Sequence, residues 1–299
     1  MRAGDVLPDT PPPGYDRAMG LLADLLEGID SPNAFVPSSK HTGLCRVCGD
    51  FRALTFEHIP PRAAGNSRPA RAFWSLQMAT SDEPLAFPTR GWKPSQRGVG
   101  GYVLCAVCNN LVGTRYVPEY VHFANTLTDR VCVLLESSGH LPGILELQLG
   151  DWALGDVARA GLVTLMDVAV HDRLLARHPD LTAVVQHPGT PLPPSLRLGL
   201  TLVLGSQARL SAPICTTNPE GCVAFSEAAL APFAWTLGFI EDGLGPLDRT
   251  SDVSDWLLYG QAERPAEATL ELPIGFLASP NPGDYRPAPE IEADMPSSD

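Results

Sequence analysis

Long apolar runs are missing from this sequence of 299 residues. No stretch of eighteen or more apolar residues occurs, which argues against a membrane-spanning helix and predicts a chain with no membrane partner. Residues 1–13 hold acids and four prolines and lack the apolar centre of a signal peptide. Lysine is also scarce, with two lysines against nineteen arginines, a bias that suggests a GC-rich bacterial gene. We therefore expect a cytoplasmic protein.

Two pairs of cysteines share the spacing CxxC. In a reducing cytoplasm, two such pairs indicate a metal site in place of disulfides. Two sulfurs separated by two residues reach one tetrahedral ion, and two pairs close a site with four protein ligands and no open position. We therefore predict a structural zinc ion held by Cys45, Cys48, Cys105 and Cys108. Core positions are expected for the unpaired cysteines, Cys132, Cys215 and Cys222.

Charge is distributed unevenly along the chain. The net charge of −13 is unfavourable for binding to nucleic acid, but between Lys40 and Tyr116 two lysines and eight arginines stand against four acids. That segment is therefore +6, which leaves −19 for the remainder. Such asymmetry is typical of a module that faces a polyanion and is attached to an acidic body.

The pattern of apolar and turn residues predicts an α+β chain in four parts. Residues 1–39 form a proline-rich lead with a short helix at 15–28, and residues 40–120 carry the chemical motifs. Residues 121–280 form a larger α+β domain of unknown role, followed by a disordered, acidic and proline-rich tail at 281–299. Helices are predicted at 119–137, 156–177 and 225–233, one strand ending at His58, and further strands at 143–150, 182–187, 197–205 and 268–277.

An acid–histidine pair follows the first CxxC pair. Alternating apolar residues before Glu57 and His58 predict a β-strand that ends where Pro60 and Pro61 forbid its continuation. At such a strand end a carboxylate and an imidazole project to opposite sides, so one can hold a divalent cation while the other contacts an attacking water. Directly after the second CxxC pair, Asn109 is predicted on the first turn of a helix. Its amide oxygen is a hard ligand suited to Mg²⁺ or Mn²⁺.

These motifs resemble those of the HNH endonucleases, in the branch with a CxxC…EH…CxxCN framework. The resemblance rests on CRVCG (45–49), TFEHIPP (55–61) and LCAVCNNLVG (104–113), and it covers about 75 residues. It implies a ββα-metal core, in which a β-hairpin and a helix grip one catalytic metal ion. The family's general-base histidine falls on His58, its acidic metal ligand on Glu57 and its helix-borne metal ligand on Asn109.

The activity that the resemblance implies is metal-dependent hydrolysis of phosphodiester bonds in DNA, although the sequence does not distinguish DNA from RNA. His58 takes a proton from water, and the metal ion on Glu57 and Asn109 neutralises charge on the phosphate. Asn110 lies about 100° further round the helix, so it is expected to contact substrate or to be structural. Flanking phosphates are expected to bind the nearest basic side chains, Arg62, Arg68 and Arg115.

One position departs from the family. Its middle asparagine, which orients the base, falls on Gly100 in this sequence. Either a backbone carbonyl or a loop side chain such as Ser95 or Gln96 takes over this role, or the enzyme is weakened.

Two other interpretations stay open. A non-enzymatic four-cysteine zinc ribbon would present its fold to nucleic acid or to protein; Gly100 favours this interpretation, and the Glu57–His58 pair argues against it because a ribbon needs no such pair. Alternatively, the chain is a regulatory protein whose −19 body masks the arginines of the +6 segment. For a nuclease, the sequence is compatible with phage defence, a mobile element or DNA processing, and it gives no oligomeric state.

Overall fold

The structure of the chain, a computed structural model, describes residues 42–67, 98–168, 173–205, 208–218, 221–240, 248–266, 269–277 and 283–286. The predicted helix at 15–28, most of the predicted tail, Arg68, Ser95 and Gln96 lie outside these residues. Helices and strands are mixed throughout the described part, which confirms the α+β prediction. The division into four parts stays a prediction.

A small antiparallel sheet carries the sequence motifs. Its strand order is β1-β2-β3, and a helix starts at the residue after β3. The middle strand ends at His58 as predicted, because Pro60 offers no N–H to continue a ladder. The elements are β1 (Thr42–Leu44), β2 (Phe51–His58), β3 (Gly100–Cys105) and α3 (Ala106–Arg115), with a short 3-10 helix, η1 (Arg62–Ala64), after β2.

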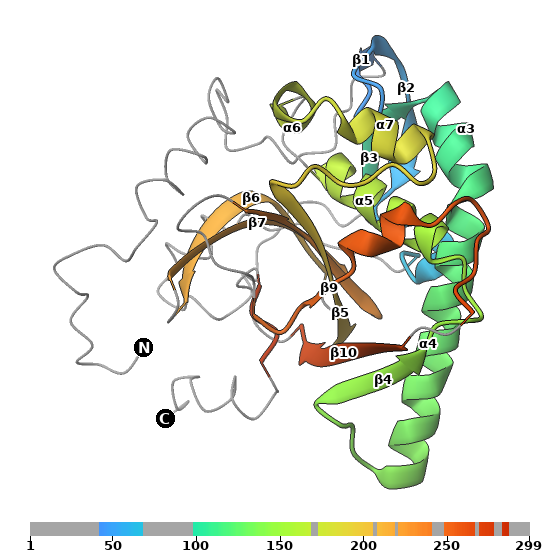
Figure 1. Cartoon of the computed structure of the whole chain (residues 1–299), viewed down its shortest axis with the longest axis vertical. Helices are drawn as coiled ribbons and strands as arrows, with labels where there is room; N and C mark the ends of the chain where they lie inside the picture. The colour runs from blue at the N-terminus through green and yellow to red at the C-terminus, as the bar shows by residue number, and fades with distance from the viewer. Residues whose placement is uncertain are drawn as a thin grey trace, which may run out of the picture.

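The helix α4 (Val117–Ser138) follows directly and confirms the helix predicted at 119–137. Its buried residues recur every three or four positions and form one apolar face. Gly139 ends it in the left-handed conformation with φ of 72°, which glycine adopts without steric cost. Figure 1 shows α4 running from the small sheet along one side of the molecule to β4.

The second half is built on a seven-stranded sheet. The path is β4-β10-β5-β8-β7-β6, with β9 paired to β5. Only the β10–β5 pairing is parallel among the described strands. The predicted strands at 143–150, 197–205 and 268–277 are confirmed as β4, β5 and β10. The strands are β4 (Ile144–Gln148), β5 (Leu196–Leu204), β6 (Ala208–Asn218), β7 (Gly221–Leu230), β8 (Phe233–Phe239), β9 (Ser251–Asp252) and β10 (Thr269–Phe276). A second 3-10 helix, η2 (Ser254–Leu258), lies between β9 and β10.

The helix α5 (Leu154–Val168) joins the two halves and is buried along its whole length. It packs against α3 and α4 on one side and against β6, β7 and β8 on the other. Gly161 permits this approach, because a Cβ atom there would lie 2.5 Å from the Trp235 ring. One hydrophobic core therefore runs from Cys45 in the small sheet to Ile274 in the large one.

Two of the predicted elements are wrong. Residues 182–187, predicted as a strand, lie in the helix α7 (Leu181–Gln186), where Leu181, Val184 and Val185 are buried at helical spacing. Residues 225–233, predicted as a helix, belong to the buried strands β7 and β8. The helix predicted at 156–177 is divided into α5 and α6 (Arg173–Arg177), with residues 169–172 outside the described part. No described helix is both long enough and apolar enough to cross a membrane.

Candidate metal centre and catalytic site

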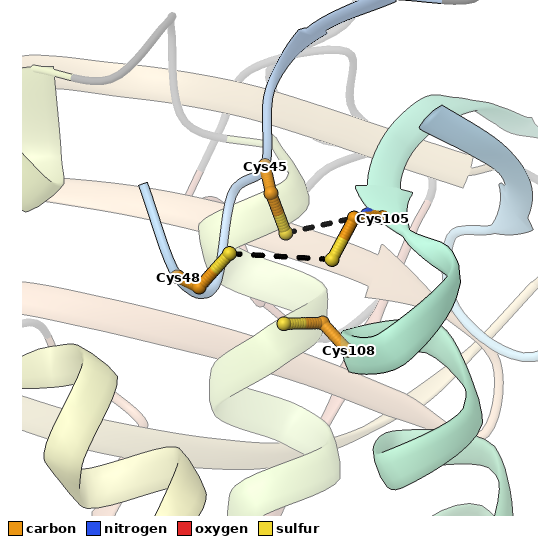
Figure 2. Close-up of side chains that lie close together, drawn as sticks. All are labelled: Cys45, Cys48, Cys105 and Cys108. Atoms are coloured by element: carbon orange, nitrogen blue, oxygen red, sulfur yellow. Dashed lines mark hydrogen bonds between the residues drawn. The ribbon is translucent and has the colours of Figure 1, made fainter. Parts of the chain in front are cut away.

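The four predicted cysteines converge on one point (Figure 2). Their sulfur atoms all lie within 4.8 Å of one another, and Sγ of Cys48 is 4.0 Å from Sγ of Cys105. Zinc bonds of about 2.3 Å in a tetrahedron place sulfurs roughly 3.8 Å apart, so the cluster has nearly the dimensions of a zinc site. A disulfide would need sulfurs about 2.05 Å apart, and all four cysteines are free. The cluster could therefore hold a metal ion such as zinc.

Local backbone structure brings the two CxxC pairs together. Cys45 and Cys48 lie in the turn between β1 and β2, where Gly49 adopts a φ of 73°. The Arg46 amide donates to the Val103 carbonyl at 3.0 Å, which fixes this turn to β3. Cys105 ends β3 and Cys108 lies in the first turn of α3, so the second pair spans a strand–helix junction.

Contact between Cys45 and Cys108 shifts the pKa values of their thiols in opposite directions. A hydrogen bond from Cys108 lowers the pKa of Cys45 to about 4, and the same bond raises the pKa of Cys108 far above its ordinary value. Burial, with a contribution from the charge of Cys45, raises the pKa of Cys48 to about 11. Cys48 and Cys108 therefore resist losing their protons beside Cys45 unless a cation offsets the repulsion, and a divalent metal ion supplies that charge.

Glu57 and Asn109 face each other across the junction of β2 and α3. Burial raises the pKa of the Glu57 carboxyl, and hydrogen bonding by the His58 backbone and the Asn109 side chain opposes this rise. Nδ2 of Asn109 also donates to Oγ1 of Thr55 at 2.8 Å. Thr55 is in turn fixed to β3, since its hydroxyl donates to the Leu104 carbonyl at 2.9 Å. A carboxylate and an amide from two adjacent elements thus form a small polar group in a half-buried position.

His58 belongs to an aromatic cluster that does not include Glu57. The Phe56 ring is 5.2 Å from the imidazole and 5.6 Å from the Tyr102 ring, with both contacts edge to face. Residues two apart in a strand share a face, so His58 and Phe56 project away from the side on which Thr55 meets Asn109. The imidazole is half-buried and accessible to a small reactant.

Gly100 is required by the backbone around it. It pairs with His58 in the β2–β3 ladder, and a Cβ atom there would lie 2.2 Å from the Glu57 carbonyl oxygen and 2.8 Å from the Phe56 ring. Asparagine therefore does not fit at this position. The departure from the family's pattern has a steric cause.

Asn66, which the sequence interpretation missed, ties the two ends of the β2–β3 connection together. Its buried Nδ2 donates to the carbonyls of Pro60 and Val99, and its Oδ1 accepts from the Val99 amide, each at 2.7 Å. The Ile59 amide donates to the same Val99 carbonyl. The three hydrogen bonds of the Asn66 side chain, called the Asn66 clamp below, therefore lie next to His58. An asparagine in a turn-rich stretch gives no sequence signal of burial, so this role is visible only in the fold.

Three of the other predicted site residues, Asn110, Arg62 and Arg115, lie on the surface. Asn110 is exposed, in contrast to its half-buried neighbour Asn109. Arg62, in η1, and Arg115, the last residue of α3, are also exposed. Cys132 is exposed on α4, so its expected core position is wrong, whereas Cys222 is buried as expected.

A second residue that sequence interpretation missed is Asp167, near the end of α5. It is 4% exposed, and its Oδ1 has no hydrogen-bond partner among the described residues. Burial raises its pKa well above the ordinary value; the charge of Glu57 adds to the rise, and the charge of Arg46 opposes it. The large α+β half of the chain thus brings a carboxylate close enough to Glu57 for their charges to interact.

No known family model, curated protein or solved structure matches this chain.

Proposed function

We propose that this chain is a metal-dependent endonuclease of the HNH type that hydrolyses phosphodiester bonds in DNA. The observation that supports it best is the meeting of Glu57 and Asn109 beside the four-cysteine cluster, on a strand pair followed by a helix. This order of elements is the one that a ββα-metal core requires. The cluster would hold a structural zinc ion, and Glu57 and Asn109 would hold a catalytic Mg²⁺ or Mn²⁺ ion through hard oxygen atoms.

The side chains divide the work according to their positions. A bound divalent ion would supply positive charge to the scissile phosphate and to the departing oxygen. The Asn109 amide nitrogen is engaged by Thr55, which leaves its oxygen for a cation. The neutral imidazole of His58 accepts a proton from the attacking water. The edge-to-face contact with the Phe56 ring helps to orient the imidazole.

The exposed arginines would bind the substrate on either side of this centre. Arg62 lies four residues after His58, and Arg115 lies about 9 Å along α3 from Asn109 at 1.5 Å per residue. Both are exposed and can therefore reach phosphates, which are recognised mainly by charge. Asn110, exposed on the same helix, is placed to contact substrate in the same way.

One observation favours the alternative of a non-enzymatic zinc-ribbon module. Phe51 is 74% exposed and is paired in the β1–β2 ladder with Leu44, which is 37% exposed. An exposed apolar pair beside a metal cluster is a feature that protein-binding surfaces share. A binding module would keep its full affinity for a partner when His58 is replaced.

The experiment that tests the proposal is cleavage of supercoiled plasmid by the purified chain with Mg²⁺ or Mn²⁺. His58→Ala should lose about 10²- to 10⁴-fold in rate, because a general base is needed only in the transition state. His122→Ala, which removes an exposed histidine from α4, is the matched control and should cut as fast as wild type. Equal cleavage by His58→Ala and wild type would contradict the proposal, and absence of cleavage in wild type would favour the binding module.

A further inference from the structure

Asp167 differs from the other buried carboxylates of the described chain. Glu227 accepts hydrogen bonds from Arg209, Tyr285 and the Gly283 amide. Asp156, on the same helix as Asp167, accepts one from the Ala262 amide at 2.9 Å. Each of these two carboxylates leaves its other oxygen without a partner, as Asp167 leaves its Oδ1. Asp167 differs because no described residue donates a hydrogen bond to either of its oxygens. A buried carboxylate that accepts no hydrogen bond at all is costly in free energy and calls for an explanation.

The surroundings of Asp167 are those of the candidate site. The helix α5 packs against α3, which carries Asn109, and Asp167 is its penultimate residue. The charged groups that act on Asp167 are Glu57, Arg46 and Cys45, all from the small sheet and its CxxC turn. The charges of two carboxylates thus act on each other, with Asp167 buried, Glu57 half-buried and the neutral Asn109 amide beside Glu57.

We propose that Asp167 is a third protein ligand of the catalytic divalent metal ion, together with Glu57 and Asn109; this inference rests on the proposed nuclease function. Two carboxylates and one amide present three hard oxygen donors from β2, α3 and α5. Such a set suits Mg²⁺ or Mn²⁺, which would complete its coordination with water and with substrate phosphate. Two negative charges match the +2 charge of the ion, and the unpartnered oxygen of Asp167 gains a partner.

This assignment gives the second half of the chain a part in catalysis. The residue comes from a helix that is wholly buried between the two sheets, so its position is fixed by the packing of both. The large sheet would then support the metal site in addition to its own fold. A fragment that ends before α5 would contain every residue of the recognised motifs and would still lack one metal ligand.

The test is a Mn²⁺ titration of the full-length, zinc-loaded chain, followed by the loss of the electron paramagnetic resonance signal of free Mn²⁺. Asp167→Asn should weaken Mn²⁺ binding by at least 10-fold, because even residues that only support metal ligands typically contribute 10- to 100-fold. Asp156→Asn, which alters the other buried aspartate of α5, is the control and should bind Mn²⁺ as wild type does. Zinc content should be unchanged in both variants.

The outcomes separate this inference from the proposed function. If wild type binds Mn²⁺ and cuts plasmid while Asp167→Asn binds Mn²⁺ equally well, Asp167 is no ligand and the nuclease proposal stands. If wild type neither binds Mn²⁺ nor cuts, both fail. A merely structural Asp167, such as a counter-ion for Arg46, would change the melting temperature of Asp167→Asn without changing its Mn²⁺ affinity.

A measurement on wild type covers the case in which Asp167→Asn does not fold. Hydrogen exchange followed by mass spectrometry should show slower exchange on addition of Mn²⁺ in peptides from β2, from α3 and from the end of α5. Slowing in β2 and α3 alone would overturn the assignment of Asp167.

Discussion

The four-cysteine cluster and the Glu57–Asn109 group are built on the same strand and helix, yet they suit opposite chemistries. Cys108 and Asn109 are consecutive residues in the first turn of α3, so their side chains point about 100° apart. The cysteine side is closed by four soft ligands, which leaves no position for a reactant. The other side offers a few hard oxygens in a half-buried place. A metal ion bound by the cysteines would fix the start of α3 and so set the geometry available to the proposed catalytic ion.

The largest effect is expected from a substitution that destroys the four-cysteine cluster. Cys45→Ala should lose its zinc and unfold or aggregate, because structural zinc contributes folding free energy directly, about 10–16 kcal/mol in isolated zinc-finger peptides. Elemental analysis and thermal unfolding measure the two effects. Cys132→Ala, which removes an exposed cysteine, should keep one zinc per chain and an unchanged melting temperature. Stoichiometric zinc in Cys45→Ala would exclude the cluster as the zinc site.

The roles proposed for His58, as the general base, and for Asn109, as a metal ligand, can be separated by mutation. Asn109→Ala and His58→Ala should both lose about 10²- to 10⁴-fold in plasmid cleavage. Raising the Mg²⁺ or Mn²⁺ concentration should partly restore Asn109→Ala and leave His58→Ala unchanged, because only the first loses metal affinity. Asn110→Ala should show a milder loss, since its side chain is exposed and turned away. Rescue of His58→Ala by metal would contradict the assigned roles.

Loss of the arginine contacts to substrate is expected to have a smaller effect, and the effect should be the same for every DNA sequence. Replacing both Arg62 and Arg115 by Glu should reduce affinity for all duplex sequences alike and lower the slope of log affinity against log salt by about 2, one for each phosphate contact. Binding measured over a range of salt concentrations tests this. The reversal Arg197→Glu, on β5 of the large sheet, is the control. An unchanged slope in the double variant would remove the phosphate role.

The smallest effect is expected from replacing Asp156, a buried carboxylate to which no metal-binding role is assigned. Burial raises the pKa of Asp156 in the folded chain, so wild type loses stability as pH rises from the ordinary aspartate range through the raised value. Asp156→Asn has no such loss, and its melting temperature relative to wild type should increase across that window and then level off. The change should be a few degrees, since about 1 kcal/mol corresponds to roughly 2 °C in a chain of this size. Calorimetry from acid to neutral pH would show it, and a relative decrease with pH would contradict the sign.

The sequence predicts the parts of the site whose signal is local. The CxxC spacing, the prolines that end β2 and the helical pattern after Cys105 each depend on a few neighbouring residues, and the structure has these elements at the expected positions. The segment at 225–233 is predicted as a helix, whereas burial of both faces within the large sheet makes it part of two strands, a case in which a short apolar run does not distinguish helix from strand. The stretch at 182–187 shows the reverse, because its β-branched residues occupy a short helix against the core.

Asp167 and Asn66 could not be predicted for a different reason. Each is a single polar residue whose partners lie far away in sequence, and no spacing rule connects Asp167 with Glu57 or Asn66 with Val99. Their positions follow from the packing of α5 and from the path of the chain after β2. Local patterns therefore reveal the motif, and the fold reveals the side chains that support it.

The Asn66 clamp also has a consequence for the tolerance of this chain to insertion. Because Asn66 bonds to Val99, the chain on either side of residues 68–97 departs from and returns to one point. These hydrogen bonds hold the chain after His58 to the residue before β3 without requiring any contact from the residues between them. A reporter domain inserted between residues 68 and 97 should therefore leave the cysteine cluster and His58 intact.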